Sequence, residues 1–424
     1  MQKELRFPKG FYWGSATSAH QVEGNNTKSD WWDWEQLPGK IKNGEKSGSA
    51  CDSYSRFEED FKIAKSLKQN AHRFSIEWSR IEPKQGKFDN KEIRHYKKVL
   101  ESLLDKKITP FVTLHHFTNP LWFSRQGGWA NKRSVDHFES FVGKITQELD
   151  PYVKYWITIN EPCVGTFWEY IEGKYPPGKH NPLLALTALR HKILAHGKAY
   201  RKIHSVSAHN PHVGFAKQVV IFSPANHKSL LDRKLANIFD FIFNEAYLKA
   251  MDVGIVSFPF SLNKRYEYLR GAWDFIGINY YQRVLIDAKM VWKDFIMRNI
   301  TIKGKERFEV EGAQFYPPGI YDAMIRLKKY NKPVYITENG LPTNNEEDRI
   351  KFLKDNLKNL HKAISQGVDI RGYFYWSLID NFEWFLGFEP KFGLVSVDLK
   401  TQKRALKKSA YAYKKICQTN SVQT

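Results

Sequence analysis

The stretch Val334-Tyr335-Ile336-Thr337-Glu338-Asn339-Gly340 joins a short apolar run to a carboxylate, and an amphipathic segment follows it. In that segment, apolar residues recur at helical spacing from Ile350 to Ile364, and Gly367 stands where a C-cap is expected. A short run with few polar residues is typical of a strand that is buried on both faces, as in a parallel sheet. The stretch therefore predicts one strand–helix unit of an α/β fold.

The same unit recurs along the whole chain. The predicted strands are Phe11–Ala16, His72–Ile76, Pro110–Leu114, Lys154–Ile159, Val213–Val219, Asp274–Ile278, Val334–Thr337 and Gly372–Trp376. Eight strand–helix units predict a single (β/α)₈ barrel domain over residues 1–424, with long loops after the first, fourth and sixth strands. A doubly wound open sheet is the alternative, but no glycine-rich phosphate-binding turn follows any predicted strand.

The composition is that of a globular protein with a basic surface. Apolar residues make up 42% of the 424 residues, which excludes a disordered chain. The 66 Lys and Arg outnumber the 45 Asp and Glu, for a net charge of +21. Such a charge could indicate an acidic partner such as nucleic acid, but the basic residues are dispersed and no RNA-binding signature is present. We therefore expect a solvated basic surface and no nucleic-acid partner.

The three cysteines and the N-terminal residues bear on location. Cys51, Cys163 and Cys417 form no CxxC motif and no disulfide framework, as is typical of a reducing compartment. The first residues, Met1–Arg6, contain no apolar core of a signal peptide, and no stretch approaches 18 uncharged apolar residues. The sequence predicts a cytoplasmic protein without a membrane partner, and it leaves the oligomeric state open.

Two glutamates stand at the ends of predicted strands. Glu161 follows the fourth strand and Glu338 follows the seventh, so each carboxylate comes directly after a buried apolar run. Each could simply cap the next helix or pair with a buried arginine. Two of them on strands that nearly face each other across a barrel favour acid/base and nucleophilic chemistry on an acetal.

Aromatic and hydrogen-bonding residues gather at the same predicted barrel mouth. They are His20, Gln21, His115, His116, Asn279, Tyr280, Tyr281, Trp376, Glu383 and Trp384. The C–H face of a sugar ring packs on an indole while its hydroxyls need donors and acceptors, so this set is suited to a polyol. The two adjacent histidines could instead bind a metal, but neighbours on an extended chain point to opposite sides and no HExxH helix is present. We expect no metal.

Residues 7–24, FPKGFYWGSATSAHQVEG, resemble the N-terminal signature of glycoside hydrolase family 1, the β-glucosidase family. Four further stretches are similar to motifs of that family and occur in the same order. They are HRFSIEWSR at 72–80, TINEP at 158–162, ITENG at 336–340 and WSLIDNFEW at 376–384. The resemblance extends over essentially the whole chain, and five motifs in register are far more specific than any one of them.

The resemblance implies a retaining, exo-acting β-glycosidase on a (β/α)₈ barrel, without a metal or an organic cofactor. It implies that Glu338 is the nucleophile and Glu161 the general acid/base. Around the nucleophile, it implies a hydrogen bond from Tyr281 and charge stabilisation by Arg73, with Asn279 as a further supporting residue. It implies that Asn160 binds the sugar 2-hydroxyl and that Trp376 stacks on the sugar ring. The residues implied for the other glycone hydroxyls are Gln21, His116, Glu383 and Trp384.

Substrate class follows from the same resemblance. Glu383 and Trp384 are similar to family members that act on unphosphorylated sugars, so small β-D-glycosides are expected, with gluco, galacto and fuco configurations first. A transglycosidase and a weakly active sugar-binding barrel remain alternatives. Two departures bear on them: Phe117 replaces the family's commoner tryptophan, and residues 251–271 are shorter than usual and lack its Gly-Asp-Tyr-Pro turn.

Overall fold

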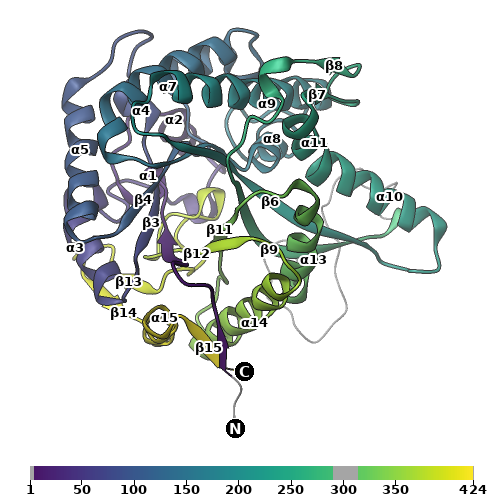
Figure 1. Ribbon diagram of the computed structural model, residues 1–424. Helices are drawn as coiled ribbons and strands as arrows, with labels where there is room; N and C mark the ends of the chain where they lie inside the picture. The colour runs from purple at the N-terminus through teal and green to yellow at the C-terminus, as the bar shows by residue number, and fades with distance from the viewer. Residues whose placement is uncertain (1–3, 290–313, 424) are drawn as a thin grey trace.

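The computed structural model of the protein describes residues 4–289 and 314–423. Eight parallel strands follow one another around a closed barrel, and helices surround it (Figure 1). The ring closes because β12 pairs with β2 and β6 pairs with β9, both in parallel. The predicted (β/α)₈ barrel is therefore confirmed.

Each predicted strand coincides with one barrel strand. The barrel strands are β2 (Tyr12–Ala16), β3 (Ala71–Ser75), β4 (Thr109–His115), β5 (Tyr155–Asn160), β6 (His212–Pro224), β9 (Ile276–Ile286), β11 (Val334–Asn339) and β12 (Ile370–Trp376). The predictions for β6 and β9 ended too early. Beyond the barrel the two strands continue as a pair, from Ile221 with Arg283 to Pro224 with Ile286. Polar residues interrupt the apolar pattern there, since the extension is no longer buried on both faces.

Helices connect the strands and cover the outside of the barrel (Figure 1). The α-helices are α1 (Ala19–Val22), α2 (Asp30–Glu35), α3 (Ser53–Ser66), α4 (Trp78–Ile81), α5 (Asn90–Asp105), α6 (Leu121–Arg125), α7 (Ser134–Leu149), α8 (Pro162–Tyr170), α9 (Pro182–Val206), α10 (Leu230–Asp240), α11 (Ala246–Val253), α13 (Pro318–Leu327), α14 (Glu346–Ser365) and α15 (Lys408–Thr419). The predicted helix after β11 is α14, and Gly367 has the positive φ of 85° that suits the position after a helix.

Short elements complete the chain. The 3₁₀ turns are η1 (Lys42–Gly44), η2 (Gly128–Ala130), η3 (Asp150–Tyr152), η5 (Glu267–Leu269), η6 (Lys328–Tyr330) and η7 (Trp384–Leu386), and η4 (Phe241–Glu245) is a π-helical turn. The short strands are β1 (Glu4–Arg6), β7 (Ile255–Val256), β8 (Lys264–Arg265), β10 (Gln314–Phe315), β13 (Val395–Val397), β14 (Arg404–Leu406) and β15 (Ser421–Gln423). Within residues 251–271, β7 and β8 form a small antiparallel pair. No helix of the described ranges is long and apolar enough to cross a bilayer.

Aromatic rings fill the interior of the barrel. Phe111, Tyr155, Phe275, Tyr335 and Phe374 are buried in one cluster inside the ring of strands. The Phe111 and Tyr155 rings stack with centroids 4.2 Å apart, and Tyr335 meets the edge of Phe111 at 5.2 Å. Part of the 15% aromatic content therefore packs the barrel interior, a role that the sequence analysis did not assign to these rings.

The long loops lie after the strands, at the end of the barrel where the carboxyl termini of the strands emerge. The predicted long loops after β2 and β5 carry α1 to α3 and α8 to α9. Part of the predicted long loop after β9 falls in residues 290–313, outside the described residues. The loop after β6 is also long, because it carries α10, α11 and the β7–β8 pair before β9 begins, and this was not predicted.

Strands from the two ends of the described chain pair with each other outside the barrel (Figure 1). β1 and β15 are antiparallel, with Leu5 opposite Val422. The side chain of Asn420 also donates to the Phe7 carbonyl at 2.8 Å and accepts from the Trp13 indole at 2.8 Å. These contacts connect the start of the first barrel strand to the end of the last helix.

Candidate active site

Glu161 and Glu338 lie at the carboxyl ends of their strands, as predicted, and both side chains are buried. Glu161 caps α8 with a left-handed backbone (φ 42°, ψ 57°). That conformation is costly for a residue other than glycine, and such strain is concentrated at functional sites. The Glu161 N–H donates to the Ala216 carbonyl at 2.7 Å, which fixes the turn against the neighbouring strand β6.

Glu338 is held by a cation and a hydroxyl. Arg73 of β3 donates to Oε1 at 2.5 Å, and the Tyr281 hydroxyl of β9 donates to Oε2 at 2.7 Å. Burial raises the pKa of the Glu338 carboxyl, whereas the Arg73 charge and the Tyr281 hydrogen bond oppose that rise. Both contacts favour the ionised carboxylate.

Glu161 has a different environment. Its Oε1 accepts one hydrogen bond, from the Asn279 amide at 2.8 Å, and Asn279 is oriented by the Thr337 hydroxyl, which donates to its Oδ1 at 2.6 Å. Burial, followed by the charge of Glu338, raises the pKa of Glu161 to about 8. The two carboxyls thus sit in one buried site whose contacts favour a charged Glu338 and a protonated Glu161.

Asn160 connects the two carboxyl environments. Its Oδ1 accepts from Arg73 at 2.7 Å and from Asn279 at 3.0 Å, and its Nδ2 lies 3.2 Å from His116 Nε2. The pKa of His116 lies well below its ordinary value, because of burial first and of Arg73 second, so its ring is neutral. His115 lies 3.0 Å from Asn119 instead, so the two adjacent histidines do point apart as expected.

Gln21, Trp376 and Glu383 form a second hydrogen-bonded group in the same site. Gln21 Nε2 donates to Asn381 at 2.9 Å and lies 3.4 Å from Glu383 Oε2. The Trp376 indole lies 3.3 Å from Glu383 Oε1. Burial raises the pKa of Glu383 to about 8. All three side chains are buried, with donors and acceptors that could exchange partners with the hydroxyls of a sugar.

An aromatic cluster surrounds Trp384. Its indole is 5.8 Å from the His20 ring in a stacked arrangement, 4.7 Å from Trp31 and 5.2 Å from Phe117. The His116 ring is nearly parallel to both indoles, with its centroid 5.9 Å from that of Trp376 and 6.1 Å from that of Trp384. Phe117 therefore keeps an aromatic contact with the cluster although it lacks an indole donor.

Two buried cations near the site were not found by sequence reasoning. Arg349 of α14 donates to the carbonyls of Leu341 at 2.8 Å, Lys391 at 2.8 Å and Phe392 at 2.9 Å, and also to that of Thr343. It thereby connects the loop after Glu338 to the loop after Trp384. Lys217 of β6 is fully buried, and its ammonium lies 4.3 Å from the Phe243 ring. The charge of Lys217 partly opposes the rise in the pKa of Glu161. Neither residue belongs to a motif. Arg349 does lie at helical spacing from the buried residues Phe352 and Leu353 of α14, and this spacing is the signal that could have marked it as buried.

A closed parallel barrel whose mouth holds two buried carboxyls among aromatic and hydrogen-bonding side chains defines a glycosidase of the (β/α)₈ class. The sequence profile of glycosyl hydrolase family 1 matches residues 3–422, and the chain belongs to that family.

Relatives from Thermotoga and Pyrococcus are similar over nearly the full length. β-Glucosidase A of Thermotoga maritima is 33% identical over 451 aligned positions, which cover 99% of each chain. A β-galactosidase of Pyrococcus woesei is 30% identical, with 98% of each chain covered. Among solved structures, a β-glycosidase from Pyrococcus horikoshii has a TM-score of 0.89 at 38% identity, covering 100% of this chain and 97% of that one. The T. maritima β-glucosidase in complex with glucoimidazole has a TM-score of 0.90 at 32% identity, covering 98% and 99%.

Proposed function

We propose that this enzyme hydrolyses unphosphorylated β-D-glycosides from the non-reducing end, with Glu338 as nucleophile and Glu161 as general acid/base. β-Glucosides are the first substrate class, with β-galactosides and β-fucosides as side activities. The observation that carries the assignment of roles is the asymmetry of hydrogen bonds: Glu338 receives a guanidinium and a phenol, and Glu161 receives a single amide.

The reaction then has two displacements. A Glu338 oxygen attacks the anomeric carbon while the bond to the leaving oxygen breaks, and Glu161 gives its proton to that oxygen. The product is a glycosyl ester on Glu338, which has lost its negative charge. Removal of that charge takes away a cause of the raised pKa of Glu161. Ionised Glu161 accepts a proton from water, the water oxygen attacks the anomeric carbon, and Glu338 departs as a carboxylate. Two inversions give overall retention.

We assign the glycone to the buried group beside the carboxyls. Gln21, His116, Asn160 and Glu383 would bind its hydroxyls and Trp376 its apolar face, with Trp384 completing the wall. Deoxynojirimycin and castanospermine, both polyhydroxylated, bind the T. maritima β-glucosidase. Their binding to a structural relative supports a sugar as occupant here.

We further propose a cytoplasmic location and one catalytic domain over residues 1–424. Cys51, Cys163 and Cys417 are free thiols, which suits a reducing compartment. The barrel draws its strands from residues 12 to 376, so the proposed domain needs both halves of the chain.

Substitution of the two glutamates tests the roles. Aryl β-glycosides of gluco, galacto, fuco, manno and 6-phosphogluco configuration are assayed with wild type, Glu338→Gln and Glu161→Gln. Glu338→Gln should abolish turnover. Glu161→Gln should spare glycosides with acidic phenol leaving groups more than alkyl glycosides, because a good leaving group needs less protonation. Glu82→Gln, which alters a buried carboxyl that accepts from the Trp78 indole at 2.7 Å, is the matched control. Wild-type rates in Glu338→Gln would refute the assignment.

A further inference from the structure

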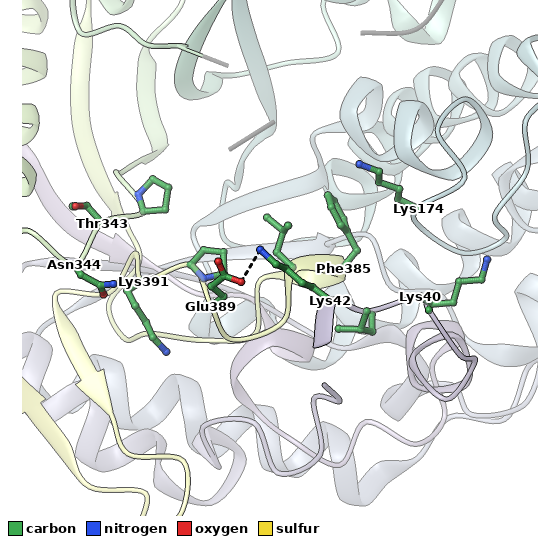
Figure 2. Close-up of a pocket in the computed structure, with 13 residues that line it drawn as sticks. Lys40, Lys42, Lys174, Thr343, Asn344, Phe385, Glu389 and Lys391 are labelled. Carbon is green, nitrogen blue, oxygen red and sulfur yellow. Dashed lines mark ion pairs between the residues drawn. The ribbon is translucent and has the colours of Figure 1, made fainter. Parts of the chain in front are cut away.

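A cavity of about 670 Å³ is lined in part by Phe385, the residue that follows Trp384 (Figure 2). Three loop regions supply its walls. They are residues 39–42 before and within η1, residues 342–344 after β11, and residues 385–386 and 389–391 after Trp384, with Lys174 completing the lining. This volume falls within the range of about 300–1,000 Å³ that ligand sites occupy.

The walls of this cavity continue from the elements of the active site. Phe385 and Leu386 directly follow Trp384, and Pro342 is four residues beyond Glu338. Lys391 is followed by Phe392, whose ring lies 6.1 Å from that of Tyr281. The glycone-binding side chains are buried, whereas most of the cavity lining is partly or fully exposed. The cavity is therefore more open to solvent than the glycone side chains, as the site of a leaving group would be.

The lining is basic. It contains four lysines and one glutamate, for a net charge of +3. Glu389 is paired with Lys42 at 2.7 Å (Figure 2). Lys40 instead lies over the Trp34 ring at 4.2 Å, and Lys174 over the Phe385 ring at 4.7 Å. The Trp34 face thus holds the Lys40 ammonium at the cavity without supplying a full negative charge.

Two of the four lysines, Lys40 and Lys391, have no carboxylate partner in the described part of the chain. Within residues 4–289 and 314–423, no carboxylate lies within 4.0 Å of Lys40 or Lys391. Figure 2 shows Lys40, Lys174 and Lys391 on different sides of the central Lys42–Glu389 pair. Such an arrangement produces a positive field over the whole cavity rather than a chelating site for one ion.

The cavity walls are also fixed in place. Glu45 Oε2 accepts from the Phe388 N–H at 2.6 Å, and Arg349 binds the carbonyls of Thr343 and Lys391. Gly387 has φ 66°, and a Cβ there would lie 2.0 Å from the Glu45 carboxylate. Glu45 therefore joins the loop after η1 to the loop after Trp384, and Arg349 holds the loop after β11 and the loop after Trp384 against α14.

We propose that this cavity, which we call the lysine pocket, binds an oxyanion on the aglycone of the substrate. The leaving group would be a sugar that bears a carboxylate or a phosphate, with the neutral glycone in the buried site. This inference rests on the proposed β-glycosidase function and adds the substrate class. Because the lysines are partly exposed, their effect is screened by salt, and selectivity for an anionic aglycone is modest and dependent on ionic strength.

Matched disaccharides test the lysine pocket. The enzyme is given β-glucosyl-(1→4)-glucose, the same compound with a glucuronate aglycone or with its neutral glucuronamide, and the same compound with a 6-phosphate on the aglycone. A fifth compound carries the 6-phosphate on the glycone. The measured quantity is kcat/KM at low and high KCl, in wild type, Lys40→Gln/Lys391→Gln and Lys62→Gln. Lys62 lies exposed on the outer side of α3 and is the matched control.

We expect wild type to prefer glucuronate over glucuronamide by about fivefold to twentyfold at low salt, and the double variant to lose most of that ratio. High KCl should reduce the ratio, and Lys62→Gln should keep it. Preference for the carboxylate alone, the phosphate alone or both identifies the anion. Equal rates for charged and neutral aglycones, or preference for the compound with a phosphorylated glycone, would overturn the proposal. If the neutral disaccharide and aryl glucosides are not cleaved at all, the proposed function has failed instead.

Discussion

Replacement of Tyr281 by phenylalanine should move the acidic limb of the pH–activity profile. The Tyr281 hydroxyl donates to Glu338 at 2.7 Å inside a buried site, and such a hydrogen bond stabilises the charged carboxylate. Hydrogen bonds to charged groups contribute about 1.5–3 kcal/mol, and 1.36 kcal/mol corresponds to one pH unit. Without the hydroxyl, the pKa of Glu338 rises. Since the nucleophile must be ionised, the acidic midpoint of kcat/KM should rise by about one to two pH units.

The assay is kcat/KM for 4-nitrophenyl β-D-glucoside across the pH range, because this quantity reports ionisations of the free enzyme. Tyr280→Phe is the matched control: it removes a neighbouring buried hydroxyl that donates to the Tyr316 carbonyl and not to a carboxylate. The reasoning is refuted if the acidic limb of Tyr281→Phe stays at the wild-type midpoint, or if Tyr280→Phe moves it equally.

Three further predictions concern the proton donor, the loops and the strand ends. Because the pKa of Glu161 is raised to about 8, its proton is present below that pH and lost above it. The value of kcat/KM should therefore fall above about pH 8, and the profile of Glu161→Gln should lack this alkaline limb. Arg349→Met leaves several loop carbonyls without a donor. It should therefore lower the free energy of unfolding, measured by urea titration, by about 3–5 kcal/mol. An unchanged unfolding midpoint would contradict this role. Gly340→Ala places a Cβ 1.9 Å from the Trp376 carbonyl oxygen, so the backbone at Trp376 must shift. Because that shift displaces the Trp376 side chain, kcat/KM should drop on the order of 100-fold, whereas near-wild-type kinetics would show that the strand end can adapt.

The sequence predicts the barrel well because its strands are buried on both faces. The run Val334–Thr337 has no solvent-facing side, so its composition alone marks it as a strand. Beyond the barrel, where β6 and β9 continue as a pair, the strands are no longer buried on both faces. There Gln282 and Arg283 are both partly exposed, and the apolar pattern ends before the strand does. The paired glutamates were found for a similar reason, since a carboxylate directly after an apolar run is conspicuous.

Contacts that depend on tertiary structure alone were not predictable. The spacing of Arg349 places it on the buried face of α14, but only the fold brings the loops after Glu338 and Trp384 to its guanidinium. The lysine pocket is a similar case, because residues 40, 174 and 391 are far apart in sequence. The sequence also could not show which aromatic rings fill the barrel interior. An aromatic residue in a strand gives the same sequence pattern whether its ring packs in a core or contacts a ligand.

The pairing of β1 with β15 has a consequence for synthesis of the protein on the ribosome. Residues 4–6 emerge early, but their partners at 421–423 emerge after more than 400 residues have been added. Closure of the ring between β2 and β12 likewise waits for residue 376. Contacts of such long sequence separation slow folding, and they leave the β1 and β2 backbones without their partners during translation. A nascent chain halted before residue 370 should therefore remain sensitive to protease near its first strand, whereas the released chain should be protected there.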